Sequence, residues 1–371
     1  MSDNPLVRLG VLGQSPWYDY ITRDLVGSGE LRRRIQEDGL RGMTSNPTIF
    51  EKAIAGSRLY DDKIRELSER GRSAAEIFEA LAVADVRAAC DEFAPLHQAT
   101  GSGDGLVSLE VSPALANDTA GTIHEAERLW QAVDRPNGMI KIPGTPAGLP
   151  AITHCVAAGI SVNVTLLFSV ERYAAVIEAY LEGMERRLAR RLPLGPISSV
   201  ASFFVSRVDG KVDPLLDRGG DRHGLRGKIA IANACAAYRL FERSLDAPRW
   251  DHLAQAGARP QRPLWASTST KDPRYPDVYY VEALIASRTV NTLPPETFAA
   301  YRDHGRPAVR IHEGMAAADG QLRLLAESGI DLQAVTRELE EEGVAKFAAS
   351  YWSLLEGIEA KVGELAISSR R

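Results

Sequence analysis

A lysine occupies the middle of an otherwise apolar run. Lys141 lies inside the segment Met139–Pro143, whose other members are all apolar. An ammonium group is rarely buried in such surroundings, because its desolvation costs on the order of several kcal/mol. Desolvation favours the neutral amine of a lysine, which is a nucleophile toward a carbonyl carbon. The pattern therefore indicates a Schiff-base lysine. Two structural roles stay open: the side chain could carry its charge out to solvent, or it could pair with Glu110.

Two carboxylates occupy comparable positions. Asp19 lies in the first apolar run, and Glu110 lies in the run Leu106–Val111. Schiff-base chemistry needs proton transfers when the carbinolamine forms, when it loses water and when a C–C bond breaks. Two carboxylates in different environments can divide these tasks. For Glu110, a salt bridge to Lys141 is the structural alternative.

Further polar residues recur near the ends of other apolar runs. Any one of them could be structural, but the set indicates one shared site. The seven histidines are scattered and lie outside the apolar runs, so we expect no metal site. The recurring polar residues are Asn46, Asn163, Thr165, Ser202, Arg207, Ser267 and Ser269.

Eight short apolar runs alternate with longer segments whose apolar residues have helical spacing, such as Ser112–Val133, Val170–Leu192 and Lys228–Leu245. This alternation predicts an α/β fold, a single (β/α)8 TIM barrel with its catalytic groups at the C-terminal ends of the strands. An open doubly wound sheet fits less well, because no glycine-rich phosphate loop follows the first run. The predicted strands are Ser15–Thr22, Leu40–Asn46, Leu106–Val111, Met139–Pro143, Ser161–Phe168, Ser199–Val205, Pro263–Thr268 and Thr289–Leu293.

Two segments of the chain are longer than a minimal barrel requires. Residues 47–105, between the second and third strands, are long enough for two or three extra helices. After the last strand, a C-terminal helix is expected at about residues 331–366, packed on the barrel. Its acidic run Glu338–Glu342 is flanked by apolar residues and predicts a solvated helix face. Since no linker divides the chain, we expect one domain over residues 1–371.

Composition narrows the classes of function. The 371 residues carry a formal net charge of −5, and no Lys/Arg block suggests a nucleic-acid interface. We find no signal-peptide pattern and no run of roughly 20 apolar residues that would span a membrane. The three cysteines form no CxxC pair, which is typical of reduced thiols in the cytoplasm. We therefore expect a cytoplasmic enzyme, as a monomer or homodimer, that binds neither nucleic acid nor membrane.

Four segments, taken in order, resemble the signature segments of transaldolases, and the resemblance extends from about Ser15 to the last helix. Ser15–Asp19 and Leu264–Lys271 are similar to the longer bacterial branch of this class I, Schiff-base-forming family. The four segments are Thr44–Thr48, Ser108–Val111, Met139–Pro143 and Asn163–Ser169.

The resemblance implies the transfer of a dihydroxyacetone unit from sedoheptulose 7-phosphate to glyceraldehyde 3-phosphate. The products would be erythrose 4-phosphate and fructose 6-phosphate, in the non-oxidative pentose phosphate pathway, with no cofactor and no metal. It implies that Lys141 forms the Schiff base and that Glu110 and Thr165 hold a proton-shuttling water. Asp19 would take the proton from the C4 hydroxyl of the donor.

The resemblance also implies how substrate is bound. The dihydroxyacetone unit would be hydrogen-bonded by Asn46, Asn163 and Ser202 and walled by Phe204, with Ser267 also among the binding residues. The phosphate would be gripped by Arg207, whose planar fork suits an oxyanion. Many family members have a second phosphate-binding arginine where this sequence has Ser269, and Lys271 could supply that charge.

Two other functions share much of this site. One is a Schiff-base aldolase that releases free dihydroxyacetone to water, and the other is a non-catalytic barrel that binds sugar phosphates. The water site formed by Glu110 and Thr165 and the size of the chain favour transfer over release. The complete set of proton-transfer residues argues against a non-catalytic scaffold.

Overall fold

The computed structural model describes residues 4–368, and these contain eight parallel strands that close into a barrel. Each strand pairs with the next, and β1 pairs with β8 to complete the closure. All eight predicted strands are confirmed, with ends that differ by up to three residues. The strands are β1 Gln14–Asp19, β2 Gly42–Thr44, β3 Leu106–Glu110, β4 Gly138–Pro143, β5 Val162–Leu167, β6 Ser199–Phe204, β7 Arg262–Ala266 and β8 Thr289–Leu293.

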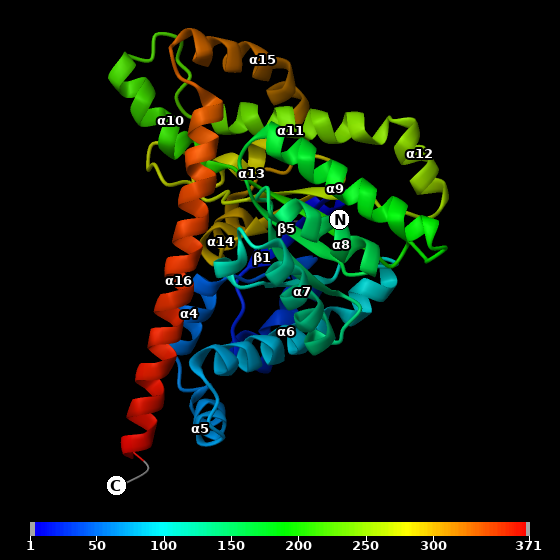
Figure 1. The fold of residues 1–371 in the computed structure, drawn as a ribbon. Coiled ribbons are helices and arrows are strands. Elements are labelled where there is room, and N and C mark those ends of the chain that lie inside the picture. Colours follow the sequence, from blue (N-terminus) through cyan, green and yellow to red (C-terminus); the bar gives the residue numbers. More distant parts are fainter. Residues whose placement is uncertain (1–3, 369–371) are drawn as a thin grey trace.

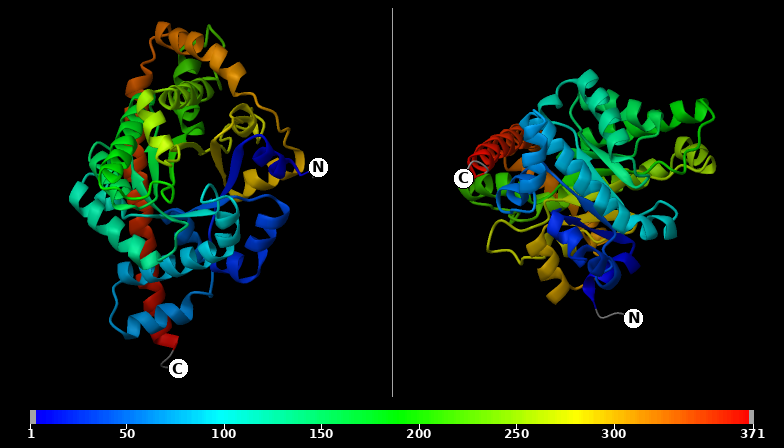
Figure 2. Two further views of the ribbon diagram at one scale, coloured as in Figure 1. Left: turned by 90° about the vertical axis from the view of Figure 1, so that its right-hand side faces the viewer. Right: turned by 90° about the horizontal axis from the view of Figure 1, so that it is seen from below.

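Helices surround the barrel, and the longest of them, α16, runs along one side of the molecule (Figures 1 and 2). The helices are α1 Pro5–Val11, α2 Arg23–Gly27, α3 Glu30–Glu37, α4 Pro47–Ala55, α5 Asp61–Glu69, α6 Ala74–Ala99, the 3-10 helix η1 Pro113–Leu115, α7 Thr119–Val133, α8 Gly148–Ala158, α9 Val170–Ala189, α10 Ser206–Gly219, α11 Ile229–Leu245, α12 Pro248–Gln255, α13 Tyr279–Ala283, α14 Pro295–His304, α15 Ile311–Glu327 and α16 Leu332–Ser368.

The expected extra helices between the second and third strands are α4, α5 and α6. The helix expected over Ser112–Val133 is divided: a 3-10 turn comes first, and α7 starts only at Thr119. The division has a local cause, because the side chain of Asp118 accepts a hydrogen bond from the backbone N–H of Gly121 and caps a new helix. Asn46 has the same capping role for α4, which ends β2 two residues before the predicted end.

Side chains fill the N-terminal end of the barrel. Asp104 accepts hydrogen bonds from Ser15, Arg41 and Arg262, which come from three different parts of the chain. The indole of Trp17 is fully buried over Gly42, where a Cβ atom would come within 2.4 Å of the ring. In parallel barrels the substrate is bound at the opposite end, where the strands have their C-terminal ends.

The helix α16 is fastened to the barrel at two places. On its N-terminal half, Lys211 of α10 pairs with Glu338 and Glu342. On its C-terminal half, Lys361 pairs with Asp61 at 2.8 Å. The helix therefore spans the barrel from α10 to α5, with its middle turns held between these two anchor points.

The acidic run of α16 is a solvated helix face, as predicted. The apolar residues of that segment, Leu339 and Phe347, are 5% and 8% exposed, while Glu338, Glu341 and Glu342 are exposed. None of the helices formed by residues 4–368 is both long and apolar enough to cross a bilayer.

Candidate active site

A cavity of about 410 Å³ lies at the C-terminal ends of the strands. Its lining comes from every strand except β3, from the segments that follow β1, β2, β6, β7 and β8, and from α16 on a further side. Nine of the eleven residues expected at the site line this cavity: Asp19, Asn46, Lys141, Thr165, Ser202, Phe204, Arg207, Ser267 and Lys271.

Lys141 is 5% exposed and lies next to the cavity. Strand register places it beside Glu110 on β3 and Asn163 on β5. Its Nζ donates to Glu110 Oε2 at 3.3 Å and to the backbone carbonyl of Ser45 at 3.3 Å. The side chain therefore does not carry its charge out to solvent; it is held inside the barrel mouth and is paired with a carboxylate.

Asp19 lies at the end of β1 on the other side of the cavity. Its Oδ1 accepts a hydrogen bond from Thr44 Oγ1 at 2.6 Å, and Thr44 Oγ1 lies 2.7 Å from Thr292 Oγ1. Burial raises the pKa of Asp19, and this effect is opposed by the charge of Lys141 and by the bond from Thr44. A carboxylate with a raised pKa is suited to accept and return a proton.

Glu110 is the second carboxylate beside the lysine, with a side chain that is 5% exposed. Burial raises the pKa of Glu110, the charge and hydrogen bond of Lys141 oppose the rise, and the charge of Asp19 adds to it. Two carboxylates with raised pKa values therefore lie near one amine. This combination can divide the proton transfers of imine chemistry.

Thr165 lies at a distortion of β5. The register of β5 against β6 shifts between Val164 and Leu167, and Leu166 has a φ of 63°. Such a bulge redirects the neighbouring side chains and is strained for a residue other than glycine. Within the part of the chain that the structure describes, Thr165 Oγ1 is buried without a hydrogen-bond partner although the residue lines the cavity. A hydroxyl so placed can bind a water or a substrate oxygen.

The structure places Asn163 one layer below the cavity. Its Nδ2 donates to Ser108 Oγ at 3.0 Å, and its Oδ1 accepts from Ser202 Oγ at 2.7 Å. It is fully buried and is not among the lining residues, in contrast to Asn46. Asn163 therefore contacts the site through Ser202, and its expected hydrogen bond to substrate stays a prediction.

The end of the cavity near β6 and β7 is basic. The guanidinium of Arg207 lies 5.3 Å from the centroid of the Phe204 ring. Among residues 4–368 it has no hydrogen bond or ion pair, and burial lowers its pKa, an effect that Glu342 partly offsets. Lys271 Nζ donates to Ser269 Oγ at 2.7 Å. A partly desolvated guanidinium whose donors are not used by the described residues is ready to bind an oxyanion.

The sequence analysis missed several residues of the site. Thr44 ends β2, Ser45 follows it, and Thr292 is the last residue but one of β8, so the rule that selected the other polar residues could have found them. Lys346 and Phe347 carried no such signal, because they lie in the middle of α16. The Phe347 ring centroid is 5.5 Å from Lys141 Nζ, and Lys346 lines the same cavity.

The charges around the cavity favour an anion. Of the described residues that line it, five are basic and two are acidic: Lys52, Lys141, Arg207, Lys271 and Lys346 against Asp19 and Glu296. A cavity walled by one dominant sign of charge concentrates ligands of the opposite sign. The arrangement can form an imine with a carbonyl compound at one end and hold an anionic group at the other.

The chain resembles proteins of one family over nearly its whole length. Residues 16–358 match the family described as Transaldolase/Fructose-6-phosphate aldolase. The chain is similar to a transaldolase of Parafrankia sp., with 48% identity that covers 98% of this chain and 99% of the relative. It is also similar to the transaldolase of Acidothermus cellulolyticus, at 51% identity over 95% of each chain, and to transaldolase 2 of Nostoc sp., at 47% over 98% of each.

Proposed function

Because the chain belongs to the transaldolase/fructose-6-phosphate aldolase family and is a transaldolase of the pentose phosphate pathway, we propose that it transfers a dihydroxyacetone unit through a Schiff base on Lys141. The observation that carries the proposal is the placement of this amine at a cavity, 3.3 Å from Glu110 and close to Asp19. Sedoheptulose 7-phosphate and fructose 6-phosphate are the proposed donors, and glyceraldehyde 3-phosphate and erythrose 4-phosphate the acceptors.

The first half of the reaction joins enzyme and donor. The free amine of Lys141 attacks the C2 carbonyl of the ketose and forms a carbinolamine, whose hydroxyl leaves as water to give the protonated imine. Glu110 supplies the proton for the departing hydroxyl, and Thr165 helps to hold the water. The same water and carboxylate act in reverse when the imine is hydrolysed.

The second half breaks and remakes a C–C bond. Asp19 accepts the proton of the C4 hydroxyl, the C3–C4 bond breaks, and its electron pair moves into the protonated imine to form a neutral enamine. An aldose phosphate leaves, while a three-carbon unit stays on Lys141. The enamine carbon then attacks the aldehyde of the acceptor, and Asp19 returns its proton to the new hydroxyl.

The basic end of the cavity binds the phosphate group in this proposal. Arg207 is the principal contact because its guanidinium has two parallel donors and makes no hydrogen bond or ion pair among the described residues. Ser267 and Lys271 add contacts from the segment after β7. Lys346 of α16 is a further cation at the same cavity, so the C-terminal helix contributes to substrate binding.

A coupled assay tests the proposed function. Fructose 6-phosphate is supplied with and without erythrose 4-phosphate, and the release of glyceraldehyde 3-phosphate is followed. A transaldolase turns over only when the acceptor is present. Steady release without acceptor, with free dihydroxyacetone in the medium, would instead identify an aldolase.

We further propose that the protein acts in the cytoplasm. Cys90, Cys155 and Cys235 are all buried and unpaired, and burial raises the pKa of each thiol to about 12. Such thiols suit a reducing compartment. We also propose that residues 1–371 form one domain, since β1 pairs with β8 and leaves no point of division. The expected monomer or homodimer stays a prediction, which sedimentation analysis would test.

A further inference from the structure

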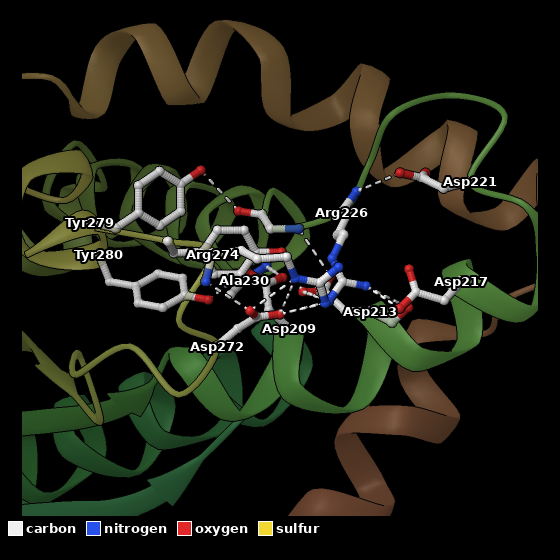
Figure 3. Close-up of polar contacts among 12 residues, drawn as sticks. Asp209, Asp213, Asp217, Asp221, Arg226, Ala230, Asp272, Arg274, Tyr279 and Tyr280 are labelled. Atoms are coloured by element: carbon white, nitrogen blue, oxygen red, sulfur yellow. Dashed lines mark hydrogen bonds and ion pairs between the residues drawn. The ribbon is translucent and has the colours of Figure 1, made fainter. Parts of the chain in front are cut away.

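A cluster of ionisable side chains joins α10 to the segment that follows β7 (Figure 3). We define it as the Asp209 cluster: Asp209, Asp213, Arg226, Tyr275 and Tyr280. Asp209 is fully buried and Asp213 is 4% exposed. The proposed reaction uses neither carboxylate, and burial of two acidic groups side by side is costly unless they are paired.

Asp209 connects three elements. It lies in the first turn of α10, and its Oδ1 accepts a hydrogen bond from the backbone N–H of Ala230, at the start of α11, at 2.7 Å. Its Oδ2 accepts a hydrogen bond from the hydroxyl of Tyr280, in α13, at 2.9 Å. Both oxygens are therefore held by donors from elements distant in sequence.

The rest of the cluster connects α10 to the segment that follows β7. Asp213 accepts from Tyr275 Oη at 2.7 Å and from the backbone N–H of Gly227 at 2.9 Å. Arg226 donates to Asp272 at 2.7 Å and also to Asp217 of α10, so it bridges the two segments. Residues 272–280 are thus tied to α10 through Asp272, Tyr275 and Tyr280.

The hydrogen bonds of the Asp209 cluster are made by residues that lie close in sequence to Arg207 and Lys271, the two cations of the phosphate end. Arg207 precedes Asp209 by two residues on the same helical turn, and Lys271 directly precedes Asp272. A second cavity of about 570 Å³ behind this end is lined by both Asp209 and Lys271. Between the two cavities, Ser206 of α10 lies 3.0 Å from Ser267, Oγ to Oγ. The backbone of Arg207 and that of Lys271 are therefore positioned by the same cluster.

We propose that Asp209 is a positioning residue for phosphate recognition, which fixes the turn of α10 that carries Arg207 relative to the segment that carries Lys271. The inference rests on the proposed function, because it assumes that these cations bind the substrate phosphate. In this proposal Asp209 does not contact the substrate and acts through Arg207 and Lys271, which do.

The chemistry of Asp209 suits this role. A carboxylate can accept on both oxygens at once, as the two donors require, whereas a protonated acid has to donate one hydrogen. Burial raises the pKa of Asp209 to about 7; the bond from Ala230 and that from Tyr280 oppose the rise, and Asp213 adds to it. The titratable and charged groups around Asp209 are Asp213, Asp217, Arg226, Lys271, Asp272, Arg274, Tyr275, Tyr279 and Tyr280.

The test compares two ligands in the full-length protein. Fructose 6-phosphate carries the phosphate and dihydroxyacetone does not, yet both form an imine that borohydride reduces on Lys141. The concentration of each that gives half-maximal trapping is measured by mass spectrometry for wild type, Asp209→Asn and Tyr280→Phe. We expect the value for fructose 6-phosphate to rise about tenfold in each variant, because a displaced Arg207 makes weaker charge-assisted hydrogen bonds to the phosphate. We expect the value for dihydroxyacetone to stay unchanged.

Tyr238→Phe is the matched control. Tyr238 is a buried tyrosine whose hydroxyl donates to the carbonyl of Ser287, away from the phosphate end. This variant loses a hydrogen bond of the same kind and should bind both ligands as wild type does. If Asp209→Asn fails to fold, Tyr280→Phe decides the question alone. This variant removes only the hydroxyl group that donates a hydrogen bond to Asp209.

The outcomes are distinguishable. An unchanged value for fructose 6-phosphate in Tyr280→Phe overturns the inference, and so does an equal rise for both ligands, which would show a general structural role. Wild-type protein that traps neither ligand would contradict the proposed function itself.

Discussion

Glu110 and Lys141 occupy paired positions on β3 and β4, and the carboxylate oxygen lies 3.3 Å from the amine nitrogen. The pair is buried, and Lys141 also lines the cavity. An ion pair that served stability alone would have no need of a cavity beside it, because such pairs often contribute little net stability. The geometry instead keeps an acid next to the nucleophile, and four predictions follow from it and from the surrounding contacts.

The first prediction concerns the nucleophile. Lys141→Arg should abolish transfer and borohydride trapping, because a guanidinium stays protonated and cannot form the imine. Lys228→Arg, at an exposed lysine outside the cavity, is the control and should behave as wild type. Trapping that maps to another lysine in the Lys141 variant would refute the assignment.

The second prediction separates the two carboxylates. Glu110→Gln should slow imine formation and hydrolysis, so that little adduct is trapped at short times. Asp19→Asn should still form the donor adduct but fail to cleave the C3–C4 bond, so that a six-carbon ketose accumulates on Lys141. Each loss should be about a hundred- to ten-thousandfold in single-turnover rate.

Mass spectrometry of the reduced adduct distinguishes the two outcomes. A three-carbon adduct in the Asp19 variant, formed at the wild-type rate, would show that Asp19 is structural. Thr44→Val is a useful companion, because it removes the hydrogen bond to Asp19 without touching the carboxylate. It should weaken cleavage less than Asp19→Asn does.

The third prediction concerns phosphate. Arg207→Ala should raise KM for phosphorylated donors about ten- to a hundredfold, the value of a charge-assisted bidentate contact. Lys271→Ala and Lys346→Ala should each raise it less, because both side chains are exposed point charges. An unchanged KM in the Arg207 variant would place the phosphate elsewhere.

The fourth prediction concerns stability and pH. The pKa of Asp209 is raised to about 7 in the folded state, well above its ordinary value. A carboxyl group with a raised folded-state pKa contributes stability that is present at low pH and is lost as pH rises through that pKa. Wild type should therefore lose this contribution between about pH 4 and about pH 7.

Asp209→Asn does not titrate, so its free energy of unfolding should rise relative to wild type across that window. The change is at most about 4 kcal/mol, since one pKa unit corresponds to about 1.4 kcal/mol. Urea unfolding at several pH values measures it. Asp62→Asn, at a fully exposed carboxylate, is the control and should run parallel to wild type. Parallel profiles for the Asp209 variant as well would show that this group does not titrate in the window.

The sequence by itself determined the barrel, and it marked the residues that are the candidates for the reaction. A buried strand is a short apolar run, and this local pattern marked all eight strands to within three residues. Lys141 was recognisable because a lysine is rarely found in an apolar run that is buried from water. Because all strands of such a barrel are parallel, their C-terminal ends lie on one side. The polar residues near those ends were therefore expected to lie together.

Only the tertiary structure decided which side chains meet. Asn163 and Thr165 lie two residues apart on β5. Asn163 is hydrogen-bonded to Ser108 and Ser202 below the cavity, whereas Thr165 lines the cavity beside a bulge. Lys346 and Phe347 reach the site because α16 is fastened at both ends by ion pairs to α10 and α5. Periodicity reports which face of an element is buried, but it carries no information on which distant element covers that face. That depends on closure of the barrel and on contacts between residues far apart in the chain.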